Sequence, residues 1–214
     1  GLDDPDEAAR FVLGLRRLRF GGIEVLTPLG AAEVYSGRTP VNLINEEFLL
    51  AVSMESDLPA IARLKRLVDI VVSAVACAVL APVALAIAAL TKLTAFRSPV
   101  LYSQVRVGRF GTTFRIYKFR TMREGAESAT GPVWAGDRDE RITGLGRVLR
   151  RFRLDEIPQF INIIRGDMSL VGPRPERPEL VAELQKAIPF YSERENIKPG
   201  LTGWAQIRYP YGSS

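Results

Sequence analysis

The 214-residue sequence carries 29 Lys and Arg against 24 Asp and Glu, a net charge of +5 and a pI of about 9.6. This balance favours phosphate-rich partners or a membrane surface. The sequence contains no histidine and a single cysteine, Cys77. Histidine-based catalytic triads, histidine–metal sites and intrachain disulfides are therefore excluded, and carboxylates, Arg, Lys, Tyr and a hard cation are left for catalysis.

The first part of the chain predicts an incomplete α/β unit. Residues 6–19 have apolar side chains at helical spacing, and Gly21-Gly22 ends this expected helix. Residues 23–26 are expected to form a strand. Because one helix and one strand cannot bury a sheet alone, we expect residues 1–62 to be the end of a larger domain followed by a linker.

Residues 70–90 are apolar apart from one serine, and about 20 such residues suffice for a helix to cross a bilayer. Pro82 near the middle removes a helical hydrogen bond and bends the helix. Basic residues flank the stretch on both sides, with Lys65 and Arg66 before it, so a helix that bends and returns to the same face is expected. A straight span and a buried core helix remain alternatives. Asp69 is expected to pair with Arg66 or to cap the first turn.

Residues 100–107 and 113–120 are rich in β-branched and aromatic side chains and are separated by Gly-Arg-Phe-Gly, which predicts a β-hairpin. The second strand ends with cations interleaved with aromatic residues, among them Lys118 and Arg120. This pattern is compatible with a nucleic-acid surface, with binding of a nucleotide diphosphate, or with the solvated edge of a hairpin.

Residues 141–153 predict a basic amphipathic helix. Leu145, Val148, Leu149 and Phe152 form one apolar stripe, and arginines cover the other faces. Such a helix lies on anionic headgroups, or docks on a core with its charged face in water. The nearby membrane-entering segment favours the membrane surface.

Two adjacent carboxylates, Asp155 and Glu156, follow this helix and precede Pro158. Aspartate is a favourable N-cap and proline is tolerated in a first helical turn, so we expect the pair to start a helix that continues to residue 164. The positive end of this helix favours ionised carboxylates. An ionised Asp155 is able to bind Mg²⁺ or to attack phosphorus; a capped, solvated helix start is the alternative.

Two prolines flank Arg174 in the run GPRP at 172–175 and fix an extended backbone around it. A fixed arginine suits bidentate phosphate recognition, and a solvated loop arginine is the alternative. We expect a helix over residues 178–188. Residues 198–206 are expected to form a glycine-rich turn that enters a strand.

Taken together, these segments resemble the polyprenyl-phosphate phosphoglycosyl transferases, the monotopic bacterial sugar transferase family. The resemblance extends over residues 65–206. Each motif alone is weak, but their order is specific. The motifs are KRLVD at 65–69 with the Pro82-broken helix, KFRTM at 118–122, DEIPQ at 155–159, GDMS at 166–169, GPRP at 172–175 and KPGLTGWAQ at 198–206.

The resemblance implies an enzyme on the cytoplasmic face of the bacterial inner membrane that uses Mg²⁺. Such enzymes transfer a sugar 1-phosphate from a UDP-sugar to undecaprenyl phosphate, release UMP and initiate exopolysaccharide, O-antigen or glycoconjugate assembly. By resemblance, Asp155 is the covalent nucleophile and a metal ligand. Glu156 is its acid–base or positioning partner, and Arg174 binds phosphate.

Further residues are assigned to substrate binding and to the membrane anchor. Lys118, Arg120 and Gln206 are expected to bind substrate. The anchor is expected to consist of a re-entrant helix over residues 63–98, with the functional positions Lys65, Arg66, Asp69 and Pro82. Membrane lipid is an expected partner, nucleic acid is not, and a homo-oligomer is left open.

The expected fold class is α/β (α+β). We expect a small, mostly helical catalytic domain over residues 99–214 with a short β-hairpin or sheet, preceded by the kinked membrane helix. By resemblance, residues 1–62 are the end of a Rossmann-like regulatory domain, and the chain is expected to be truncated at its C-terminus.

Two other functions stay open at this point. One is a membrane-tethered basic module that binds lipid or nucleic acid without catalysis. The other is a metal-dependent lipid-phosphate hydrolase that uses the same carboxylates. No motif in the sequence names the sugar.

Overall fold

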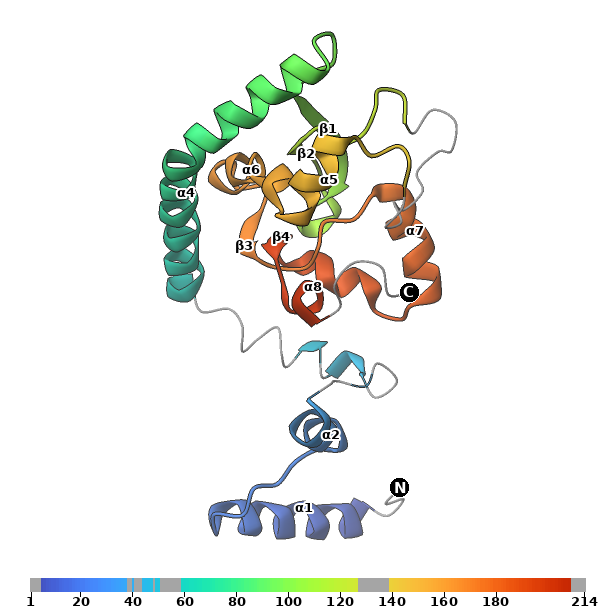
Figure 1. Ribbon diagram of the computed structural model, residues 1–214. Helices are drawn as coiled ribbons and strands as arrows, with labels where there is room; N and C mark the ends of the chain where they lie inside the picture. The colour runs from blue at the N-terminus through green and yellow to red at the C-terminus, as the bar shows by residue number, and fades with distance from the viewer. Residues whose placement is uncertain are drawn as a thin grey trace. The chain divides into compact units, whose positions relative to one another are not determined.

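The structure is a computed structural model, and it divides into two compact units, residues 1–58 and 59–214 (Figure 1). The residues that it describes are mostly helical, with two small two-stranded sheets and one long apolar helix, which agrees with the predicted fold class. The structure describes residues 5–37, 40, 44–47, 49–50, 59–126 and 139–208.

The first unit contains helices α1 (Pro5–Phe20) and α2 (Pro28–Ser36). Helix α1 confirms the helix predicted from periodicity, and Gly22, with a φ of +85°, ends it in the left-handed region that glycine adopts without strain. The strand predicted at residues 23–26 is wrong, because these residues are irregular and no strand lies beside them in the described part of this unit. Its Rossmann-like origin stays a prediction.

Helix α2 was not predicted, although the sequence carries a start signal for it. Thr27 Oγ1 accepts a hydrogen bond from the backbone N–H of Gly30 at 3.1 Å, as an N-cap residue does. Pro28 occupies the first helical position, where its missing N–H has no cost.

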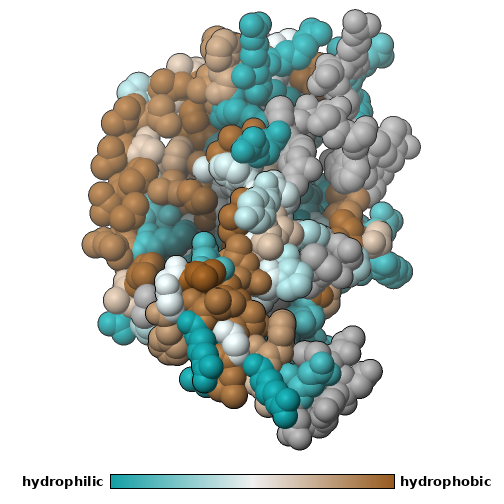
Figure 2. Space-filling model, turned by 90° about the horizontal axis from the view of Figure 1, so that it is seen from below, coloured by the Kyte–Doolittle hydropathy of each residue, from teal (hydrophilic) through white to brown (hydrophobic). Residues whose placement is uncertain are grey.

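In the second unit, helix α4 (Pro59–Thr94) contains Pro82, and Figure 1 shows that the helix bends in its middle. In the most apolar stretch of 18 residues of this helix, only 11 % is buried inside the protein. Figure 2 shows the corresponding apolar side chains along the left margin, on the side where Figure 1 places α4. The alternative of a buried core helix is therefore wrong, and the helix is long and apolar enough to enter a membrane.

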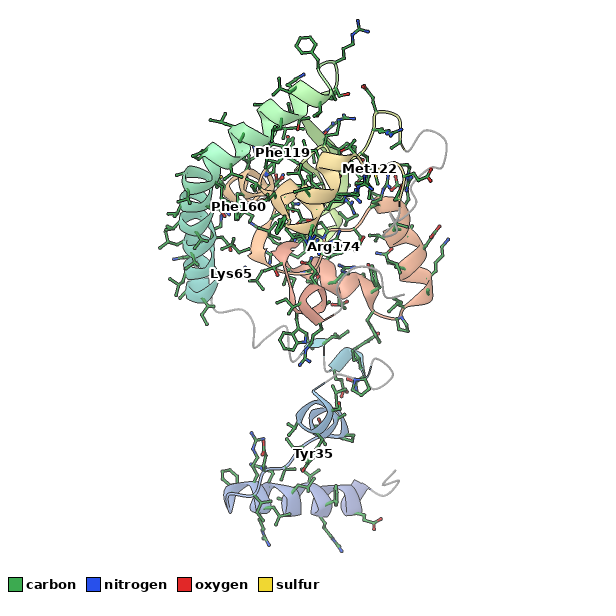
Figure 3. All side chains as sticks on the ribbon, viewed as in Figure 1. Tyr35, Lys65, Phe119, Met122, Phe160 and Arg174 are labelled. Atoms are coloured by element: carbon green, nitrogen blue, oxygen red, sulfur yellow. The ribbon has the colours of Figure 1, made fainter. Side chains whose placement is uncertain are left out.

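The first half of α4 is joined to the globular part by polar contacts. Asp69 is buried, accepts a hydrogen bond from the backbone N–H of Leu170 at 3.0 Å, and pairs with Lys65 at 3.5 Å. The predicted pairing of Asp69 with Arg66 is wrong. Arg66 instead donates to the carbonyl oxygens of Ile163 and Ile164, at 2.6 and 2.7 Å, because the last carbonyls of a helix lack helical partners. Figure 3 shows Lys65 at the lower end of α4.

The predicted hairpin is confirmed as strands β1 (Leu101–Val107) and β2 (Thr113–Phe119), with the 3₁₀ turn η2 (Arg109–Gly111) between them. The antiparallel register pairs Arg106 with Phe114 and Tyr102 with Lys118. Since directly opposed residues share a face of the sheet, Arg106 and Lys118 lie on the same face.

Helix α5 (Gly144–Arg151) confirms the predicted basic helix in shortened form, with Thr143 as its N-cap. Leu149 of the expected apolar stripe is buried in one core with Ile87 of α4, whereas Val148 and Phe152 are exposed. The stripe is therefore split between core and surface.

Gly146 lies so close to Thr121 that it has no space for a side chain. A Cβ at this position would lie 2.1 Å from Thr121 O, whereas a Cβ at Gly144 in the same helix would have nothing within 4 Å. We expect Gly146→Ala to lower the free energy of unfolding by about 1–3 kcal/mol, because backbone must move to admit the methyl group. Chemical denaturation measures this, with Gly144→Ala as the matched control that should lose no stability. Equal effects of both changes would contradict the close approach.

Two segments distant in sequence form a parallel pair, β3 (Ser169–Val171) and β4 (Gly200–Thr202). Gly172 N donates to Thr202 O at 2.9 Å, and Gly200 N donates to Pro173 O at 2.8 Å. These bonds place the GPRP run beside the glycine-rich segment.

The remaining elements complete the second unit. Helix α7 (Pro178–Ala187) confirms the helix predicted over 178–188. It is followed by the 3₁₀ helix η4 (Tyr191–Asn196). The segment expected to end in a strand forms β4 and then the short helix α8 (Trp204–Arg208).

Candidate active site

The acidic pair lies in a 3₁₀ turn, η3 (Leu154–Glu156), before helix α6 (Gln159–Arg165). The expectation that Asp155 caps a helix is wrong, because the N-cap position of α6 is Pro158, which makes no side-chain cap. Arg153 has a φ of +56° and turns the chain into η3, so the carboxylates lie one turn before α6.

Asp155 is almost fully withdrawn from solvent, with 7 % of its surface exposed. Burial raises the pKa of its carboxyl group, the charge of Lys118 lowers it, and the charge of neighbouring Glu156 raises it. Among the described residues, no hydrogen-bond donor reaches Asp155 Oδ1. This oxygen is therefore left for a ligand or for reaction.

Glu156, in contrast, is held by two cations. Lys118 Nζ lies 3.1 Å and Arg153 Nη1 3.6 Å from Glu156 Oε1. Burial lowers the pKa of Lys118, and the charge of Glu156 raises it. The two adjacent carboxylates are thus unequal: Glu156 is paired, whereas Asp155 keeps an oxygen without a partner.

Arg174 is largely buried, and the alternative of a loop arginine in water is wrong. Its carbonyl oxygen accepts from Arg194 Nη2 at 2.5 Å, and the next carbonyl, of Pro175, accepts from Arg106 Nη1 at 3.1 Å. Glu176 Oε1 lies 3.8 Å from Arg174 Nε. Burial lowers the pKa of Arg174. The backbone of the loop is therefore clamped, and Figure 3 shows Arg174 in the middle of the second unit.

A shallow, partly open pocket brings most of the predicted site residues together. Among its lining residues are the predicted Lys118, Glu156, Arg174 and Gln206. Arg120 does not line it, since its Nε donates to Pro99 O at 3.0 Å.

The pocket is also lined by residues that the sequence analysis did not assign to the site, although several of them lie within its motifs. They are Arg106, Ile116, Gln159, Pro175, Gly200 and Leu201. Strand alternation was the available signal for Arg106, which shares its face with Lys118. Gln159 stood inside the DEIPQ motif but carried no signal of its own.

The residues present are compatible with Mg²⁺. In the described part of the chain, no three His, Cys, Asp or Glu side chains come together to enclose a metal ion. Mg²⁺ does not need such a cage, because it is commonly held by one or two carboxylates together with substrate phosphate oxygens and water. The unpartnered Asp155 Oδ1 meets this requirement.

Comparison with known proteins adds independent information. A family model described as "Bacterial sugar transferase" matches residues 60–214. The chain is 38 % identical over 212 residues to a UDP-N-acetylgalactosamine-undecaprenyl-phosphate N-acetylgalactosaminephosphotransferase of Aeromonas hydrophila, covering 99 % of this chain and 49 % of that protein.

Several relatives are named UDP-glucose:undecaprenyl-phosphate glucose-1-phosphate transferase, among them proteins of Caulobacter vibrioides and Escherichia coli. The protein of Caulobacter vibrioides is 40 % identical over 171 residues, covering 79 % of this chain and 63 % of the relative. The protein of Escherichia coli is 41 % identical over 144 residues, which cover 67 % of this chain and 31 % of the relative. The chain thus spans about half the length of the Aeromonas relative and less than two thirds of these two.

Proposed function

Because the chain belongs to the bacterial sugar transferase family, we propose that it transfers a sugar 1-phosphate from a UDP-sugar to undecaprenyl phosphate and releases UMP. The observation that carries the proposal is the buried Asp155, with an unpartnered carboxylate oxygen, next to a pocket that contains Lys118 and Arg174. The names of the relatives support the same reaction. They differ in the sugar, so the sugar is left open.

In the proposed first step, Asp155 attacks the phosphorus that bears the sugar. A bond forms between the carboxylate oxygen and this phosphorus, and the bond from phosphorus to the bridging oxygen breaks. UMP leaves with the bridging oxygen, and an aspartyl-phosphosugar remains. In the second step, an oxygen of undecaprenyl phosphate attacks the same phosphorus, which frees the carboxylate and forms the lipid diphosphate-sugar.

Attack by an anion on a diphosphate requires neutralising charge. Lys118 and Arg174 supply two cations at the pocket, and the clamped backbone around Arg174 fixes its position. Gln206 contributes a neutral polar side chain to the same wall.

Glu156 acts by positioning. Its carboxylate pairs with Lys118 at 3.1 Å and thereby fixes the ammonium group at the pocket. The acceptor phosphate is already ionised at neutral pH, so the second step needs no general base. A positioning role therefore explains Glu156 better than proton transfer.

Mg²⁺ is part of the proposal. Asp155 would hold the ion together with oxygen atoms of the bound diphosphate. When bound there, it supplies positive charge that stabilises the leaving phosphate.

The apolar helix α4 supports a site at the membrane, where a water-soluble donor meets a lipid acceptor. We propose that α4 enters the bilayer, bends at Pro82 and leaves on the cytoplasmic face. The exposed Val148 of the basic helix α5 and the exposed Phe152 that caps its C-terminus suit the headgroup boundary beside it.

The proposed topology predicts that both ends of α4 are reached from the cytoplasmic side alone. Cysteines replacing Arg63 or Arg97, in a Cys77→Ser background, should react with a membrane-impermeant maleimide in inside-out vesicles but not in intact cells. A cysteine replacing Ala81, beside Pro82, should react in neither. Labelling of positions 63 and 97 from opposite sides would show a straight span instead.

The reaction itself is tested by incubating the membrane-inserted protein with Mg²⁺, undecaprenyl phosphate and each of a panel of UDP-sugars. We expect UMP and a lipid-linked diphosphate-sugar in equal amounts. Release of inorganic phosphate or free sugar phosphate would identify a hydrolase. No product with any donor, despite lipid binding, would support a binding module.

A further inference from the structure

Two buried N–H donors in the pocket have no acceptor. Arg106 Nε and Gln159 Nε2 both lack a hydrogen-bond partner among the described residues, and both side chains line the pocket beside Lys118 and Arg174. Gln159 is 2 % exposed, and the Arg106 side chain is 13 % exposed. Neither group is therefore freely solvated.

The unpartnered polar atoms are not scattered through the protein. In the described part of the chain there are four such buried side-chain atoms, on Ser73, Arg106, Asp155 and Gln159. Two of these residues line the pocket, and a third is the proposed nucleophile next to it. Because a buried polar atom without a partner costs stability, their concentration at one place points to a ligand that supplies the missing partners.

Arg106 is held through its two terminal nitrogens, whereas its Nε has no hydrogen-bond partner among the described residues. Its Nη1 donates to Pro175 O at 3.1 Å, and its Nη2 donates to Gln104 Oε1 at 2.6 Å. Glu176 Oε2 lies 3.8 Å from Nη1. The guanidinium group is thus held by three neighbours while Nε has none.

Gln159 reaches the pocket from a different element, helix α6. It is the first residue of α6 and follows Glu156 by three positions, so one short stretch of chain carries both the acidic pair and this amide. The hairpin carries Arg106 and Lys118 on one face. A ligand in the pocket would therefore lie beside both unpartnered donors.

We propose that Arg106 and Gln159 are substrate-binding residues whose free N–H groups donate to oxygen atoms of the bound nucleoside diphosphate sugar. This inference rests on the proposed function. The donor substrate is rich in acceptor oxygens, whereas the hydrocarbon part of the acceptor lipid offers none. Arg106 adds a third cation to Lys118 and Arg174, and Gln159 adds a neutral donor near Asp155.

The test is to replace Gln159 by Met, which keeps the length of the side chain and removes its polar atoms. We expect the KM for the UDP-sugar to rise about tenfold or more, with a smaller change in kcat. The melting temperature without substrate should stay equal or rise, because an unpartnered buried amide has been removed. If Gln159 only stabilised the fold, Gln159→Met would have a lower melting temperature and an unchanged KM.

Arg106→Lys is the second variant; it keeps the charge but removes the Nε donor together with the two Nη hydrogen bonds to Pro175 O and Gln104 Oε1. We expect a similar rise in KM. The matched controls are Gln185→Met and Arg147→Lys, which change exposed residues outside the pocket and should keep the parent KM.

A binding measurement separates this inference from the proposed function. Thermal stabilisation by UDP should be weaker in Gln159→Met and Arg106→Lys than in the parent, whether or not the parent releases UMP. Absence of UMP release by the parent would refute the proposed reaction alone. An unchanged KM together with unchanged stabilisation by UDP in both variants would overturn the role of Arg106 and Gln159.

Discussion

Asp155→Asn is expected to lower the rate of UMP release by at least about a thousandfold, because the amide cannot form the bond to phosphorus. The change keeps size and shape, so binding to vesicles should stay at the parent level. Release of UMP in a single turnover, measured with radiolabelled UDP-sugar, checks this. Robust turnover by Asp155→Asn, or turnover by the parent without label on Asp155, would remove the proposed nucleophile.

The stability of this variant supplies its control. Because burial raises the pKa of Asp155, the folded state holds this proton more tightly than the unfolded state does. The parent therefore loses stability as the pH rises from the ordinary carboxyl pKa of about 4 through the raised value. The stability of Asp155→Asn does not fall in this way, so near pH 7 its melting temperature should equal or exceed that of the parent. The difference in melting temperature between Asp155→Asn and the parent should become smaller below about pH 4.

Lys118→Met is expected to reduce UMP release by about a hundredfold and to shift the acid side of the pH–rate profile to higher pH. The ammonium group both pairs with Glu156 and lowers the pKa of Asp155. Without it, the pKa of Asp155 rises further, so a larger fraction of the nucleophile is protonated near neutral pH. Initial rates measured across a pH series check both effects.

Lys186→Met is the matched control for Lys118→Met, because Lys186 is an exposed residue of α7 outside the pocket. Its activity and its pH–rate profile should equal those of the parent. A loss of activity in Lys118→Met without any shift of the acid side would mean that Lys118 contacts substrate but does not set the pKa of Asp155.

Elements whose signal is local were predictable from the sequence. The apolar run around Pro82 gave helix α4, and β-branched alternation gave the hairpin β1–β2. The failures have non-local causes. The turn at Arg153 depends on a left-handed backbone that its neighbours impose, and a strand at 23–26 would have needed a partner.

The candidate site was only partly predictable for the same reason. Motifs led to Lys118, Glu156 and Arg174, which the pocket unites. The free donors of Arg106 and Gln159 could not be found in this way, because a missing hydrogen bond is visible only when every neighbour has been placed. The three-residue strands β3 and β4, which bring the two loops together, have too short a pattern to be recognised.

The hydrogen bond from the N–H of Leu170 to Asp69 joins helix α4 to the segment that carries the proposed substrate-binding loop. Leu170 belongs to β3, and the chain reaches Arg174 four residues later. If α4 lies in the bilayer as proposed, a tilt of this helix would be transmitted along a path of a few bonds to the loop that is proposed to bind the pyrophosphate. Removing residues 59–98 to obtain a water-soluble enzyme would therefore loosen this loop as well as release the protein from lipid.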